Sequence, residues 1–277
     1  MKTLTLPLPQ IGERVASAYL QGYVRELDPK ITQTAYPALI IVPGGSYTHI
    51  PEAQAETMAL AFAAHGLQVF YLRYHFIKDT APKPLLPQPI IDLGAAVLTL
   101  RQHASEFRIN PTQIIAAGFS VGGHIVSLYA DYWQSKWLTH ALNVHPEQLK
   151  LAAAILSYPV IRLDAGFPAS QEQLTKITNQ PAKFAADEAV TNANPPTFIW
   201  HTMDDPMVPV SNSLRYLTAL YQQKIPVEAH FFHHGPHGLA LANQQTAWKA
   251  DANQPHVAHW VDLAIEWLNE TLALNLF

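Results

Sequence analysis

Short apolar runs alternate with segments of helical spacing along most of this chain. Continuous or alternating apolar residues predict strands, and apolar residues three and four apart predict amphipathic helices. The predicted strands are 16–24, 37–47, 67–75, 114–120, 151–160, 196–205 and 227–235, and the predicted helices are 52–66, 90–107, 121–133, 212–223 and 256–270. Strands separated by helices pair in parallel through right-handed crossovers. The pattern therefore predicts an open α/β sheet with helices on both faces.

Three segments interrupt this alternation. The proline-dense stretch 80–89 predicts a loop, and Asn-Pro-Thr-Gln at 110–113 predicts a turn. Residues 161–194 are polar and irregular, so we expect an insert there, short for a large lid. Since no repeat or linker stands out, residues 1–277 are predicted to form a single domain.

Composition narrows the possible partners. Of 277 residues, 49% are hydrophobic and 14% charged, with a net charge of −4. No dense Lys/Arg cluster occurs, which argues against nucleic acid and a polybasic membrane anchor. No apolar run approaches the roughly 20 residues of a membrane helix, and Pro7 and Pro9 interrupt a signal-peptide core. We expect a soluble cytoplasmic protein.

Metal and thiol chemistry find little support in the sequence. The chain has no cysteine, which excludes disulfides, thiolate metal ligands and a cysteine nucleophile. His233 and His237 lie four apart, but Gly235 and Pro236 break any helix that would align them. We therefore expect no metal and no cofactor.

One serine stands at a predicted strand–helix junction, in the stretch IIAAGFSVGGHIVSLYA. A nucleophile on such a tight turn is lifted clear of the backbone, and the helix N-terminus favours developing negative charge. Gly118 and Gly122 flank Ser120 where a Cβ would clash with neighbouring elements. This context predicts that Ser120 is a nucleophile rather than a helix cap.

A serine nucleophile needs a base that is oriented by a third group. Asp204 and Asp205 end the next-to-last strand, and His237 follows the last strand in a Pro-His-Gly loop. All lie at the carboxyl edge of the sheet, in the chain order Ser, acid, His. We favour Asp205 over Asp204, which points the opposite way if the strand pleat continues. We favour His237, with His234 as its alternative.

Acyl transfer also needs N–H donors for the oxyanion. The N–H of Val121, directly after the nucleophile, is one candidate. The Pro-Gly-Gly-Ser-Tyr loop at 43–47 ends another strand, and Gly45 or Ser46 is the expected second donor.

These motifs together resemble the bacterial carboxylesterases of the α/β-hydrolase superfamily, in the acetyl-esterase or acetylxylan-esterase-like group near the hormone-sensitive-lipase relatives. The matching segments include VPGGSY, LQVFYLRY, IIAAGFSVGGH, HTMDDPMVPVSNSLRYLTAL and GPHGLALA. The resemblance implies an eight-stranded, mostly parallel sheet whose first two strands come from the N-terminal segment. It also implies a Ser120–His237–Asp205 triad, short acyl groups, no cofactor and, in many relatives, a homo-oligomer.

One departure concerns the oxyanion loop. Lipase-type relatives read His-Gly-Gly-Gly there, whereas this chain reads Val42-Pro43-Gly44-Gly45-Ser46. The resemblance implies hydrolysis of short-acyl esters, and acetylated sugars are among the candidate substrates. Two alternatives remain open: a serine peptidase of the prolyl-oligopeptidase type and an inactive binding protein. Six aromatic residues near the expected rim are candidates for a substrate pocket or for ordinary core: Tyr47, Tyr74, Phe119, Trp133, Tyr158 and Trp200.

Overall fold

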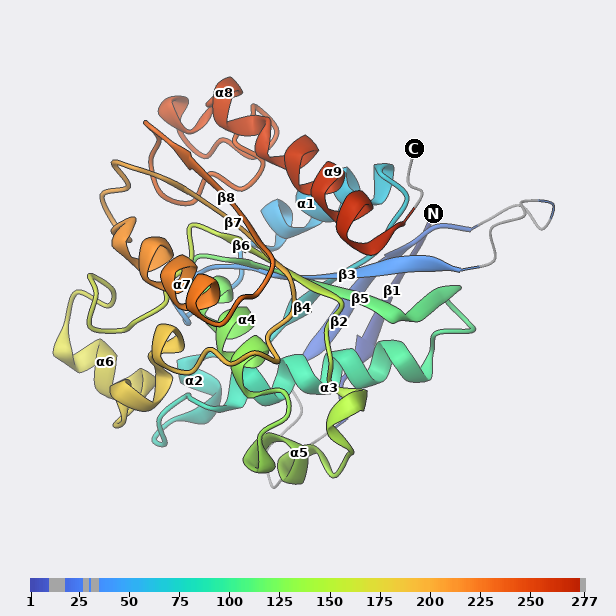
Figure 1. Ribbon diagram of the computed structural model, residues 1–277, viewed down its shortest axis with the longest axis horizontal. Helices are drawn as coiled ribbons and strands as arrows, with labels where there is room; N and C mark the ends of the chain where they lie inside the picture. The colour runs from blue at the N-terminus through green and yellow to red at the C-terminus, as the bar shows by residue number, and fades with distance from the viewer. Residues whose placement is uncertain (10–17, 27–29, 31–34, 275–277) are drawn as a thin grey trace.

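Eight strands form one sheet through the centre of the molecule (Figure 1). The computed structural model describes residues 1–9, 18–26, 30 and 35–274. The strands are β1 (Lys2–Pro7), β2 (Tyr19–Val24), β3 (Tyr36–Val42), β4 (Gln68–Arg73), β5 (Ile109–Phe119), β6 (Ala153–Ser157), β7 (Thr197–Thr202) and β8 (Val227–Phe232). Their order is β1-β2-β4-β3-β5-β6-β7-β8. The strands from β4 to β8 run parallel, and β1 and β2 pair antiparallel at one end.

The helices lie on both faces of the sheet, as predicted (Figure 1). Phe62 of α1 (Glu52–Ala64) packs against Trp260 of α9 (Trp260–Leu272) on one face. The other face holds α3 (Gln88–Gln102), α4 (Val121–Tyr132) and α7 (Ser211–Gln222), and Tyr216 of α7 donates a hydrogen bond to Asp131 of α4. Central strands such as β3 are buried along their whole length, which explains their continuous apolar sequence.

The structure corrects several boundaries. The turn predicted at 110–113 is wrong, because β5 already begins at Ile109 and pairs there with Tyr36. The ladder then shifts register and resumes at Ala38 and Ile114, so the Asn-Pro segment is accommodated in an irregular strand. The helix predicted at 90–107 runs from Gln88 to Gln102, and residues 103–108 form turns. The last helix is split at His259 into α8 (Pro255–Ala258) and α9.

Some elements carry too little pattern to be predicted. They are β1, α2 (Ile77–Thr80), α5 (Lys136–Leu142) and a short 3-10 turn (Pro146–Gln148). The insert is more regular than expected, with α6 (Gln171–Ile177) and 3-10 turns at Pro181–Phe184 and Ala186–Glu188. The start of the strand predicted at 16–24 falls on residues 16 and 17, outside the described residues. No helix in the described ranges is long and apolar enough to span a membrane.

Candidate active site

Ser120 sits on the sharp turn between β5 and α4. Its backbone has φ 55° and ψ −120°, a conformation that L-residues rarely adopt. Close contacts hold the turn in place: a Cβ on Gly118 would lie 2.4 Å from the carbonyl oxygen of Gly122. A Cβ on Gly122 would lie 1.9 Å from the carbonyl oxygen of Val42. The two glycines therefore let β3, β5 and α4 approach one another, and this approach forces the serine out of its strand.

Ser120, His237 and Asp205 form one chain of hydrogen bonds. His237 Nε2 lies 2.8 Å from Ser120 Oγ, and His237 Nδ1 lies 2.7 Å from Asp205 Oδ2. The other carboxylate oxygen of Asp205 accepts the N–H groups of Met207 and Val208 at 2.9 and 3.0 Å. Because the carboxylate accepts, Nδ1 of His237 carries the proton and Nε2 is free to accept from Ser120.

The alternative pair, Asp204 and His234, lies apart from this chain. Asp204 Oδ2 bonds to Nδ1 of His234, and Asp204 Oδ1 accepts the Gly235 N–H at 2.8 Å. The side chains of Asp204 and His234 are 48% and 55% exposed, whereas that of Asp205 is fully buried. The four residues thus sort into a buried pair that reaches Ser120 and a surface pair that does not.

His201 is a site residue that the sequence analysis missed. Its Nε2 lies 3.0 Å from the Val208 carbonyl oxygen and 3.2 Å from Asp205 Oδ2, and its Nδ1 lies 2.7 Å from Ser213 Oγ. A carbonyl only accepts, so Nε2 carries the proton and also points it at the carboxylate. Burial acts to raise the pKa of Asp205, but hydrogen bonds from His201 and His237 outweigh it and hold that pKa well below its usual range.

The loop at 43–47, called the donor turn below, lies against Ser120. A Cβ on Gly44 would lie 3.1 Å from the Cβ of Ser120 and 3.2 Å from the Phe119 carbonyl oxygen, so a side chain there would push the turn a little away from Ser120. Gly45 and Ser46 donate no main-chain hydrogen bond to any described residue. Val121 is the first residue of α4, where N–H groups have no partner within the helix. These three N–H groups are therefore available to a bound oxygen.

The six candidate aromatic residues are buried core side chains, none more than 5% exposed. Tyr158 still borders the site: its ring centroid lies 5.0 Å from that of His237, edge to face, and its hydroxyl accepts the Ala240 N–H. Trp133 does not lie at the rim. It borders a cavity of about 850 Å³ at the opposite edge of the sheet, where β5, β6 and β7 begin.

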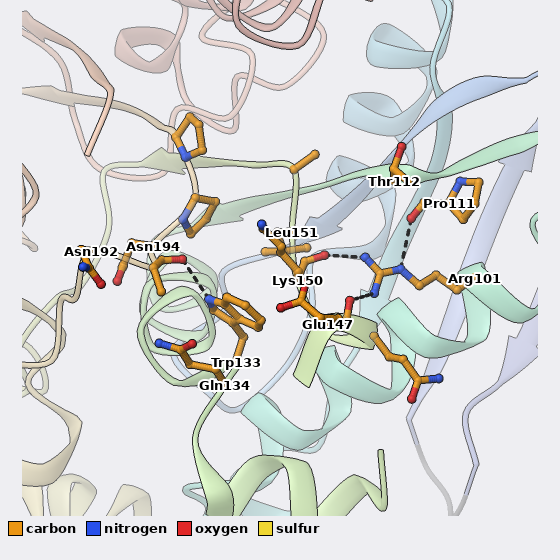
Figure 2. A pocket seen from close by; sticks show the side chains of 15 residues that line it. Arg101, Pro111, Thr112, Trp133, Gln134, Glu147, Lys150, Leu151, Asn192 and Asn194 are labelled. Carbon is orange, nitrogen blue, oxygen red and sulfur yellow. Dashed lines mark hydrogen bonds between the residues drawn. The ribbon is translucent and has the colours of Figure 1, made fainter. Parts of the chain in front are cut away.

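That cavity offers little chemistry (Figure 2). Its most prominent cation, Arg101, already donates to the carbonyl oxygens of Pro111, Glu147 and Lys150, and Trp133 donates to the Ala193 carbonyl. These donor groups are therefore already hydrogen-bonded to neighbouring segments of the protein rather than directed toward a ligand. Among the described residues, no group of His, Asp and Glu side chains is arranged to hold a metal ion.

His124, one helical turn after Ser120, makes stability depend on pH. Burial lowers its pKa to about 4 from the usual 6.5. Between these values the unfolded chain binds a proton that the folded chain excludes, so the free energy of unfolding falls as the pH drops from about 6.5 to about 4. The slope for this one group is at most about 1.4 kcal/mol per pH unit. In urea titrations at pH 7, 6 and 5, we expect a His124→Asn variant to lose less stability than the parent; parallel losses would contradict this assignment.

The comparisons with known proteins cover most of the chain, and those with solved structures cover nearly all of it. The BD-FAE family model matches residues 27–220. The carboxylesterase Cest-2923 from Lactobacillus plantarum WCFS1 is similar in structure, with 32% identity, a TM-score of 0.91 and 99% of each chain covered. An acetyl ester-xyloside bifunctional hydrolase from Caldicellulosiruptor lactoaceticus has 28% identity and a TM-score of 0.79, with 98% of this chain and 97% of that one covered.

Curated relatives match over part of their own length. Endo-1,4-beta-xylanase B from Butyrivibrio fibrisolvens is 31% identical over 222 residues, which is 75% of this chain and 33% of that protein. Across the first three curated relatives, the chain spans 33% to 49% of their length. The similarity to these longer proteins therefore concerns one segment of each.

Proposed function

The chain belongs to the BD-FAE family and has the α/β-hydrolase fold, and we propose that it is a serine carboxylesterase that removes short acyl groups from esters. The observation that carries the proposal is the hydrogen-bonded chain from Ser120 through His237 to Asp205, beside three available N–H groups. The family model and the similar solved structures confirm the family and the fold that the sequence resemblance implied.

The proposed mechanism follows from the protonation states at the site. His237 Nε2 accepts the Ser120 proton as Oγ attacks the ester carbonyl carbon, and the oxyanion is bound by the N–H groups of Val121 and of Gly45 or Ser46. His237 then gives the proton to the leaving alkoxide. Water repeats the sequence on the acyl-enzyme and releases the carboxylic acid. Asp205 keeps the proton of neutral His237 on Nδ1 and stabilises the imidazolium that forms.

An acetyl ester of a sugar is the proposed substrate class. Two similar proteins support it by their names: one hydrolyses acetyl esters and xylosides, and the other is a xylanase. The buried ring of Tyr158 lies edge to face against His237, and an aromatic side chain fixed beside the catalytic histidine supports the proposal of a small acyl group.

Three finer features are also proposals. They are a single domain over 1–277, a cytoplasmic location, for which the absence of cysteine is an argument, and assembly into a homo-oligomer, which the resemblance implies. Mass measurement of the purified protein in solution tests the last.

An ester panel tests the proposed function. We expect kcat/KM to be highest for 4-nitrophenyl acetate and to fall at least about tenfold by the decanoate, with release of acetate from an acetylated xylo-oligosaccharide. Better turnover of the decanoate would contradict the short-acyl proposal. An aminoacyl-nitroanilide cleaved faster than the acetate would favour the peptidase alternative. A folded protein that neither turns over esters nor reacts with a fluorophosphonate would favour the binding protein.

A further inference from the structure

The donor turn has an unusual backbone. Gly45, Ser46 and Tyr47 have φ values of 119°, 54° and 62° in succession, and two of these residues are not glycine. Such a conformation persists only where surrounding contacts hold it. The turn must nevertheless keep its N–H groups aimed at one point, because an oxyanion donor acts through its exact position.

Tyr47 anchors this turn in the protein interior. Its side chain is fully buried, and its hydroxyl lies 2.7 Å from Nδ1 of His124. His124 Nε2 lies 2.8 Å from the carbonyl oxygen of Phe184. Because that carbonyl only accepts, Nε2 carries the proton and Nδ1 is the acceptor for the Tyr47 O–H. The low pKa of buried His124 keeps this tautomer neutral at ordinary pH.

The chain of contacts links three parts of the molecule. Tyr47 belongs to the donor turn, His124 to the helix that begins at Ser120, and Phe184 to the insert at 161–194. The insert touches the donor turn a second time, since the Gln173 side-chain amide lies 3.5 Å from the Ser46 carbonyl oxygen. The insert is itself joined to the loop before α3 by main-chain bonds from Leu85 and Leu86 to Lys176 and Ile177.

We propose that His124 is a positioning residue: it ties the insert to the donor turn through Tyr47 and thereby fixes the oxyanion donors relative to Ser120. This rests on the proposed function, in which Gly45 or Ser46 donates to the oxyanion. It gives the insert a role in catalysis without its acting as a lid. The effect belongs to the transition state, so it is expected in kcat and only weakly in KM.

Replacing His124 with glutamine or with asparagine distinguishes its hydrogen bond to Phe184 from its hydrogen bond to Tyr47. A glutamine side chain reaches toward Phe184 but has no acceptor at the position of Nδ1, whereas an asparagine oxygen lies near that position and keeps the Tyr47 bond. We expect Tyr47→Phe and His124→Gln each to lower kcat for 4-nitrophenyl acetate about ten- to a hundredfold, with KM changed less than about threefold. The double variant is expected to be no worse than the single ones, and His124→Asn to be intermediate.

Tyr129→Phe is the matched control. Tyr129 is equally buried on the same helix, and its hydroxyl donates to the Leu149 carbonyl, far from the donor turn. The Tyr129→Phe variant also loses one buried hydrogen bond of a tyrosine hydroxyl, but we expect its kcat to stay unchanged. The inhibition constant of a trifluoromethyl ketone, which forms an oxyanion on the serine, should rise in the Tyr47 and His124→Gln variants by the factor that kcat/KM falls.

The outcomes are distinguishable. If Tyr47→Phe and His124→Gln unfold more easily but keep kcat within about twofold, as Tyr129→Phe does, the contacts are only structural and the inference is wrong. If they raise KM and leave kcat unchanged, it is wrong as well. If the parent protein itself neither hydrolyses esters nor reacts with a fluorophosphonate, the proposed function is wrong, and this result is distinct from a failure of the proposed role of His124.

Discussion

Replacing Ser120 with alanine is expected to lower kcat for 4-nitrophenyl acetate roughly a million-fold. The residual rate would come from binding and from the oxyanion donors alone. The variant keeps the Cβ, and with it the packing of the strand–helix turn, so its unfolding midpoint should stay close to that of the parent. Initial rates and thermal unfolding of both proteins, purified in parallel, test this expectation.

A fluorophosphonate probe provides an independent measurement. The parent should be labelled on a peptide that contains Ser120, and the alanine variant should not be labelled at all. Retention of most of the activity by the variant, with contaminating esterases excluded by co-elution of activity and protein, would remove Ser120 from the mechanism.

The parallel strands were predictable because burial imposes a simple pattern on them. A strand covered by helices on both faces, such as β3, is a continuous run of apolar residues. The edge strand β1 alternates exposed and half-buried residues over only six positions, a signal too short to separate from a loop. The break at His259 has no proline or glycine to mark it, and Asn110-Pro111 is as typical of a turn as of the irregular strand that it forms here.

Some features of the candidate site could likewise be predicted from the sequence, and others could not. The chain order Ser, acid, His and the position of each residue at the carboxyl end of a strand suffice to select Ser120, an aspartate near 205 and a histidine near 237. They do not determine which aspartate meets which histidine, because that depends on how two loops pack. The roles of His201 and His124 depend on partners 4 to 77 residues away that only the folded chain brings near. A lone buried histidine carries no such information in the sequence.

The two adjacent Asp–His pairs allow a sharp test of the proposed triad. We expect Asp205→Asn to lower kcat on the order of 10⁴-fold, because an asparagine amide favours the wrong tautomer of the histidine. His237→Ala is expected to cost about as much as loss of the serine, since the nucleophile then lacks its base. Asp204→Asn and His234→Asn are expected to keep kcat within about threefold.

The surface pair is a close control for the buried one. Like the buried pair, the surface pair consists of an aspartate and a histidine, and Asp204 is the chain neighbour of Asp205. In both pairs the hydrogen bond joins an aspartate Oδ2 to a histidine Nδ1. In Asp204→Asn the amide oxygen still accepts the Gly235 N–H, so the loop that carries His237 keeps its anchor. Steady-state kinetics of the four variants on one acetyl ester decide between the pairs. A loss of activity in the Asp204 and His234 variants that matched the loss at Asp205 and His237 would mean that the exposed pair takes part in proton transfer, and the mechanism built on the buried pair would have to be abandoned.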